Sequence, residues 1–227
     1  MTANEQIAED TIARTIYLSR YSAGLRKDVI KLLNQVEKDL IAALPSVTTQ
    51  VRKDRLNKML AESRALIKDG YAEVSALTSS ELATLSVDEA EWQKLTINDA
   101  ITVEIMTAMP TEAALVAMTK NTLVQGAVNA DWWARQDANL QFQYTNAVRT
   151  GMAQSETIGQ ISNRVQQVMD VSRRDATALV RTSVQTVAIE ARDMTMQKNS
   201  AVIKGKVSIA TLDGRTTPVC MAYSGAT

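Results

Sequence analysis

The sequence predicts a mainly α-helical protein: a long antiparallel helical hairpin near the N-terminus, further helices, and a small β element of one or two strands near the C-terminus. Apolar residues recur at steps of three and four through most of the 227 residues, as in helices that bury one face. Only Pro45, Pro110 and Pro218 can interrupt them. Aromatic residues are 4% of the chain and there are ten Met, which fits helix packing better than a β-sandwich.

The N-terminal hairpin is predicted from two long apolar stripes. The first helix is expected over residues 11–44, with Gly24 as a weak point and Pro45 as its end. The second is expected over residues 51–77. Because the connection between them is short, the two helices should fold back antiparallel to one another.

The middle of the chain is predicted as shorter helices separated by polar breaks. Residues 78–86 form one break, after which Ser86 and Glu89 have the spacing of a capping box that opens a new helix. Further helix starts are expected at Thr111, Ser155 and a second capping box, with ends at Pro110, Gly126 and Gly151; that second box is Ser172 with Asp175. The expected organisation is a hairpin over 1–80, a helical middle region over 81–150 and a C-terminal unit over 151–227.

The C-terminal unit ends differently from the rest of the chain. Residues 206–212 alternate between apolar and polar side chains, with Val207 and Ile209 on one side, which is the pattern of a strand. Asp213–Gly214 then forms a turn dipeptide. One or two strands are not stable alone in water, so this element should pack on the helices, on a partner or on further chain.

Composition argues against several kinds of chemistry. The chain has no His and one Cys, so a catalytic triad, a His-ligated metal or an internal disulfide cannot form within it. No glycine-rich phosphate or dinucleotide loop occurs, so no cofactor is expected. A nucleophilic Cys220 would need a lowered pKa and a base, which leaves an enzymatic role as the weakest hypothesis. No catalytic residue is assigned, and no apolar run is long enough to span a membrane.

Charge is unevenly distributed although the formal net charge is zero. Residues 20–70 carry a net +5, residues 71–112 a net −7 and residues 151–227 a net +3. Solvated helix faces explain this pattern most simply. The alternative is that the segments face different partners, with the basic helices at 20–70 contacting DNA through Arg52, Lys53 and Arg55. Trp132–Trp133 leaves a similar choice between an interface anchor and core packing, of which core packing is favoured.

The segment "ALVRTSVQTVAIEAR…KVSIATLDGRTTPVCMAYSGAT" resembles the phage minor head protein family, the Mu F-like head morphogenesis proteins. In that family an Arg-Thr and a spaced Ala-Arg lie on one helix, followed by a strand and an Asp-x-Arg-Thr-x-Pro-x-Cys run. The matching residues are Arg181, Thr182, Ala191 and Arg192 on the helix, and Asp213, Arg215, Thr216, Pro218 and Cys220 in the run. The resemblance covers residues 150–227.

The resemblance implies a structural protein of tailed-phage heads that binds the portal protein on the capsid interior, in several copies, during head assembly. Other head or scaffold proteins and packaged DNA are further partners that it implies, and a role in genome delivery is known for some members. The family often continues with a His-Pro-x-Cys-Arg-Cys element, which is not found before Thr227. We therefore expect either a longer chain or a shortened member.

The residues of the motif also suit a structural role. Asp213 can accept backbone hydrogen bonds within its own turn, and Arg215 can pair with it. Thr216 or Thr217 can cap the segment that begins at Pro218. Cys220 would then pack as a small apolar side chain. The motif is therefore expected to fix a small β element onto a helix.

Overall fold

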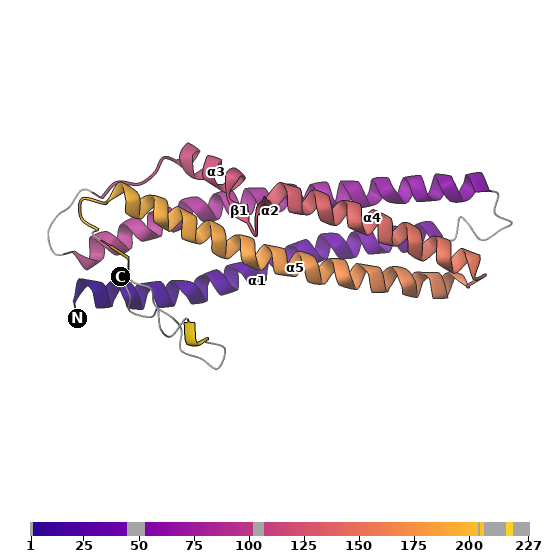
Figure 1. Ribbon diagram of the computed structural model, residues 1–227, viewed down its shortest axis with the longest axis horizontal. Helices are drawn as coiled ribbons and strands as arrows, with labels where there is room; N and C mark the ends of the chain where they lie inside the picture. The colour runs from indigo at the N-terminus through magenta and orange to yellow at the C-terminus, as the bar shows by residue number, and fades with distance from the viewer. Residues whose placement is uncertain (1, 45–52, 102–106, 204, 207–216, 220–227) are drawn as a thin grey trace.

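The computed structural model describes residues 2–44, 53–101, 107–203, 205–206 and 217–219 (Figure 1). It contains α1 (Ala3–Ala43), α2 (Lys53–Ala100), α3 (Glu112–Asn121), β1 (Leu123–Val124), β2 (Ala127–Val128), α4 (Asn129–Ala153) and α5 (Ile158–Lys198). At 1.5 Å per residue the 48 residues of α2 extend for about 70 Å, so the molecule is a rod. The predicted fold class, mainly α with a long N-terminal hairpin, is confirmed.

Two antiparallel hairpins make the rod. In the first, Tyr21 of α1 bonds to Glu81 of α2, and Val36 of α1 lies against Gly70 of α2. In the second, α4 runs back along α5 from the turn at residues 154–157. Figure 1 shows α4 and α5 packed along α1 and α2. α3 lies beside α2, in the half of the rod away from the α4–α5 turn.

One hydrophobic core runs through both hairpins. Its largest fully buried side chains include Leu33 and Leu40 of α1, Ile67 of α2, and Trp133 and Tyr144 of α4. α5 has buried residues along its whole length, from Ile161 to Thr195, at helical spacing. The burial of one stripe on each helix is the reason that the four helices stay together.

Helices α2 and α5 are continuous where the sequence indicated breaks. α2 passes through residues 78–86 without interruption, and Ser86 and Glu89 are buried inside it rather than capping a new helix. α5 likewise passes through Ser172 and Asp175 and is capped at Thr157, whose hydroxyl accepts from the Gln160 amide. Both capping-box predictions were wrong, because a serine is also tolerated inside a helix when its hydroxyl bonds to a carbonyl of the preceding turn, as that of Ser86 does to Ala83.

Other boundaries shift by smaller amounts. α1 begins eight residues earlier than expected, at a capping box made by Thr2 and Glu5, and Gly24 does not end it. The Thr111 cap is confirmed, since its hydroxyl accepts from the Ala114 amide, but α3 ends at Asn121. α4 continues through Gly151 to Ala153.

The described β element is a hairpin that the sequence analysis did not identify. Leu123 pairs with Val128 and Val124 with Ala127, around a two-residue turn. Gln125 has φ 51° and Gly126 has φ 89°, as the tight turns of β-hairpins require. The strand expected at residues 206–212 lies, apart from Lys206, outside the described residues. Four residues in two strands are too short to show an alternating pattern.

Gly70 and Gly24 provide a matched test of helix packing. A Cβ on Gly70 would lie 2.2 Å from Cγ2 of Val36, whereas one on Gly24 would meet nothing within 4 Å. Valine has one preferred rotamer in a helix, so it cannot turn away from the added methyl group. We expect Gly70→Ala to lower the free energy of unfolding by about 1–3 kcal/mol. Gly24→Ala should raise it by about 0.5–1 kcal/mol. Urea denaturation of both variants measures this, and a stabilised Gly70→Ala protein would contradict the close helix contact.

Candidate functional site

A buried carboxylate lies between two arginines where α1, α2 and α5 meet. The side chain of Glu89 in α2 is 0% exposed. Its Oε1 accepts from Nε of Arg14 in α1 at 2.8 Å, and its Oε2 accepts from Nε of Arg192 in α5 at 2.6 Å. Each carboxylate oxygen therefore has a cationic donor from a different helix, which is the condition under which a buried charge is tolerated.

Two aromatic rings support the arginines. The Arg192 guanidinium lies 4.7 Å from the centre of the Trp92 ring, and that of Arg14 lies 5.4 Å from it. Arg14 also lies 3.9 Å from the centre of the Tyr17 ring. Since the two cations exceed the one carboxylate by one charge, the π faces compensate part of the remainder. We call Arg14, Glu89, Trp92 and Arg192 the charged cluster.

The charged cluster binds three helices together, and its charged side chains are mostly buried. Arg14 and Arg192 expose only 15% and 12% of their side chains, and Glu89 none. From the sequence, Arg192 is part of a family motif, whereas the capping role expected for Glu89 was wrong and no pattern indicated Arg14 or Trp92. No sequence spacing links residues 14, 89 and 192, so only the tertiary structure reveals the cluster.

A neutral polar network joins α2, α4 and α5 in the centre of the rod. Oγ1 of Thr78 donates to the Val74 carbonyl and accepts from Nε1 of Trp133 at 2.9 Å and Nδ2 of Asn129 at 3.3 Å. Ser183 then donates to Oδ1 of Asn129 at 3.1 Å. The hydroxyl of Thr78 thus acts as both donor and acceptor. The hydrogen bonds that these polar groups would make with water are therefore replaced inside the protein.

The side chains of Trp132 and Trp133 lie in different environments. Trp133 is 1% exposed and is part of the core. Trp132 is half-buried, and its indole N–H donates to the Val124 carbonyl of the β-hairpin at 2.6 Å. Both therefore stabilise the fold, as the core interpretation predicted, and the guanidinium of Arg135 lies 5.4 Å from the centre of the Trp132 ring.

Near the end of α5, Asn199 fixes the segment that precedes α3. Its side-chain oxygen accepts from the Ala108 amide and its NH₂ donates to the Ala108 carbonyl, both at 2.8 Å. The same NH₂ group donates to the Thr195 carbonyl at 2.7 Å. One amide side chain thus replaces a pair of backbone hydrogen bonds, and it orders residues around 108 although they lie far from Asn199 in sequence.

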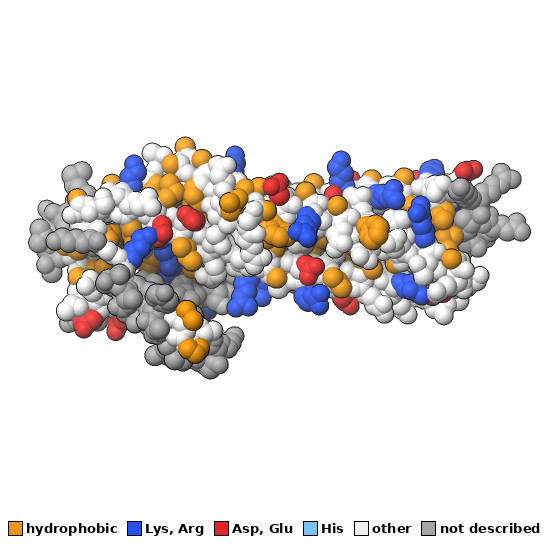
Figure 2. Space-filling view, viewed as in Figure 1, with side chains coloured by type: hydrophobic (Ala, Val, Ile, Leu, Met, Phe, Trp, Pro, Cys, Tyr) orange, Lys and Arg blue, Asp and Glu red, His pale blue; other side chains and the backbone are white. Residues whose placement is uncertain are grey.

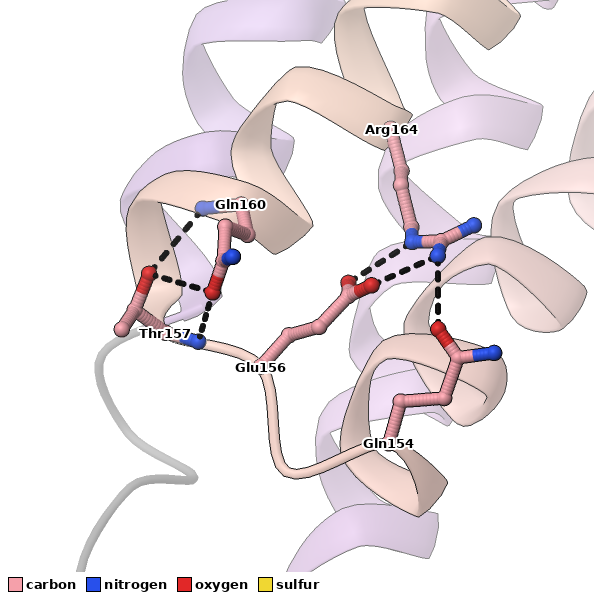
Figure 3. A network of polar contacts seen from close by, with 5 residues as sticks. All are labelled: Gln154, Glu156, Thr157, Gln160 and Arg164. Atoms are coloured by element: carbon pink, nitrogen blue, oxygen red, sulfur yellow. Dashed lines mark hydrogen bonds and ion pairs between the residues drawn. The ribbon is translucent and has the colours of Figure 1, made fainter.

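The turn between α4 and α5 is held by a second ion pair (Figure 3). Arg164 donates to both carboxylate oxygens of Glu156, with Nε at 2.7 Å, and also to Gln154. Hydrogen bonding from Arg164 lowers the pKa of Glu156 below its usual range. Thr157 and Gln160 close a capping box beside it. This arrangement fixes the hairpin geometry, and Ser155 at φ 54° makes the reversal.

Two hollows, of about 420 and 470 Å³, open along the outer surface between α4 and α5. The first is lined by residues including Trp132, Arg135 and Asp175, and the second by residues including Gln143 and Val171. Asn139 lines both, so the hollows form one groove along the two helices. Its lining combines apolar side chains with amide and hydroxyl groups, of which Asn139, Gln143, Asn146 and Gln167 are exposed.

Only some of the residues that match the family motif lie in the described part of the chain. Ala191 is buried in a small cluster with Ala90 of α2 and Leu115 of α3, and Arg192 is in the charged cluster. Arg181 is exposed, and Thr182 bonds to the Ala178 carbonyl. Pro218 is exposed. Asp213, Arg215, Thr216 and Cys220 lie outside the described residues.

Two of the three residues proposed for DNA contact, Lys53 and Arg55, are at the start of α2. Arg55 is exposed there. Lys53 is the first residue of the helix, and Arg52 lies outside the described residues. The first turn of α2 also contains Asp54, so Arg55 does not stand in a purely basic surface.

Comparison with protein-family models, with curated proteins and with solved structures gave no match for this chain. Within the described ranges, no three His, Cys, Asp or Glu side chains gather as a metal site would require. None of the described helices is both long and apolar enough to cross a membrane.

Glu89→Gln tests the charged cluster. The substitution leaves two poorly exposed arginines without their carboxylate, so we expect the free energy of unfolding to fall by about 3–5 kcal/mol. The control is Glu62→Gln, which removes the exposed pair with Lys58 that is 3.9 Å apart and should change stability by less than about 0.5 kcal/mol. Guanidinium denaturation measures both. Equal effects of the two substitutions would contradict the assigned role of Glu89.

The folded protein is expected to lose stability at high pH because the side chain of Tyr71 is buried. Burial raises its pKa to about 12, above the value of 10.0 that a free tyrosine has. The unfolded chain therefore loses this proton above about pH 10 while the folded chain keeps it, so the contribution is complete below pH 10 and is lost as the pH rises toward 12. Between these values we expect Tyr71→Phe to reduce the fall in unfolding free energy by about 2 kcal/mol. Urea denaturation at pH 8 and pH 11.5 checks this, and identical pH slopes would contradict it.

Proposed function

We propose that the chain is a structural minor head protein of a tailed bacteriophage, which binds the portal protein on the capsid interior and acts in head morphogenesis. The observation that supports the proposal is that polar side chains inside the rod hold its helices together. The charged cluster, the Thr78 network and the Asn199 contact each join segments distant in sequence. These contacts make the rod rigid, and a rigid protein is better suited to assembly than to catalysis.

The resemblance at residues 150–227 gives the proposal its biological context. Two of its residues, Ala191 and Arg192, pack against α2 and so connect the C-terminal unit with the N-terminal hairpin. Under the proposal, the unit that carries the motif and the variable N-terminal helices act as one body. The rigid helical surface then supplies protein contacts to the portal, with several copies around it, at the portal vertex of the capsid.

The proposal is tested with virions and portals of the phage or prophage that encodes the chain. We expect mass spectrometry to detect the chain in purified virions, at a few copies for each portal. The chain should also co-elute with the co-expressed portal protein on size exclusion. Absence from both virions and portal complexes would exclude the proposal.

The DNA-handling alternative gives a different result in the same preparation. It requires the isolated chain to retard duplex DNA at low salt, and the triple variant Arg52→Gln, Lys53→Gln and Arg55→Gln to bind more weakly with a smaller salt dependence. Portal binding that is unchanged in this variant, without retardation of DNA, favours the structural role.

A further inference from the structure

The groove between α4 and α5 has the geometry of an unfilled helix-packing seam. Its lining includes residues 132, 136, 139, 143, 146 and 150 of α4 and residues 164, 168, 171, 175, 178 and 182 of α5, together with five further positions of these helices and residues 124 and 125 of the β-hairpin. Both series advance by alternating steps of four and three. That is the heptad spacing with which helices present side chains to a packed neighbour.

Each of these helices already has another stripe buried in the core. In α4, Trp133, Leu140, Tyr144 and Val148 face the core. The groove residues lie beside that stripe, so α4 has two adjacent packing faces of which one is occupied within the chain. Helices in the interior of a bundle have two such faces because they contact neighbours on both sides.

The chemistry of the groove is that of a surface able to bind its own copy. Asn139, Gln143, Asn146 and Gln167 line it with exposed side chains, and each amide offers both donors and acceptors. Two identical amide faces can therefore satisfy one another, whereas two identical charged faces would repel.

The charges in the lining are balanced. Arg135 and Asp175 have opposite signs in the first hollow, and Arg164 in the second is already paired with Glu156 at the helix turn. Over α4 and α5, Figure 2 shows cationic, anionic and apolar side chains that are scattered and do not form a patch of one charge. A nearly neutral groove does not suit a nucleic acid or an anionic lipid surface, both of which need a concentration of cations.

Apolar anchors flank the amides. Phe142 is 62% exposed on α4 between Asn139 and Asn146, and Val171 is 44% exposed on α5. Residues 132–150 span about 27 Å of helix, and two adjacent helices are about 20 Å wide. The contact would thus bury about 1,000 Å² over both copies, at the lower limit for a specific interface, which indicates reversible association.

We propose that the α4–α5 groove is a docking surface for a second copy of the chain, with the two α4–α5 faces packed against each other around a two-fold axis. The contact adds a seam rich in Asn and Gln to a protomer whose own core is already closed. Amides at seam positions fix the register of helix pairing at some cost in affinity. The inference rests on the groove alone and does not depend on the proposed role in phage heads.

Sedimentation equilibrium of the full chain up to millimolar concentration tests the proposal. We expect the chain to form a dimer reversibly. The double variant Gln143→Glu and Asn146→Glu places like charges on both apposed faces and should weaken the dimer about tenfold or more. The matched control, Gln166→Glu and Gln197→Glu, adds the same charges at exposed sites outside the groove and should dimerise as the original chain does. Circular dichroism verifies that both variants are folded.

A cysteine cross-link locates the contact independently. In a Cys220→Ser background, Gln143→Cys lies near the centre of the groove and should give a disulfide-linked dimer on mild oxidation, whereas Gln166→Cys should not. A chain that stays monomeric up to millimolar concentration would overturn the proposal. So would dimers unaffected by the Gln143→Glu and Asn146→Glu pair, or equal cross-linking at residues 143 and 166, because the copies would then meet on another surface.

Discussion

The buried carboxylate of Glu89 constrains the arrangement of the whole rod. A charge removed from water must be paired. Here the pairing groups are Arg14 of α1 and Arg192 of α5, which are 75 and 103 residues away from Glu89 in the sequence. A shift of either helix by one turn would separate Arg14 or Arg192 from Glu89 by about 5 Å. The apolar core makes the helices associate, while this cluster selects the register in which they do so.

Register selection recurs at the other polar contacts. Thr78 connects to Trp133 and Asn129, and Arg173 of α5 pairs with Glu37 of α1. Leucine and valine contacts alone tolerate sliding between long helices, because one apolar ridge resembles the next. Hydrogen-bonded groups do not tolerate it, since a misplaced buried donor or acceptor is left unsatisfied. The rod therefore combines a generic core with a few specific contacts along its length.

This division also organises the surface of the rod. The core-facing stripes of α4 and α5 are packed within the chain, whereas the neighbouring stripes line an open groove that contains amide, hydroxyl and apolar side chains. A rigid body with a neutral seam on one side is suited to side-by-side assembly, because its backbone loses little conformational entropy when the surface is covered.

The sequence by itself determined the helical class, the antiparallel N-terminal hairpin and the Thr111 cap, because these depend on local periodicity and capping chemistry. It could not determine that Ser86 and Ser172 lie within continuous helices, since a capping box and an interior serine have the same local sequence. The β-hairpin at 123–128 was too short to leave a pattern. Only the tertiary structure decided the charged cluster, because pairing Glu89 with Arg14 and Arg192 depends on which helices meet, and no local spacing encodes that.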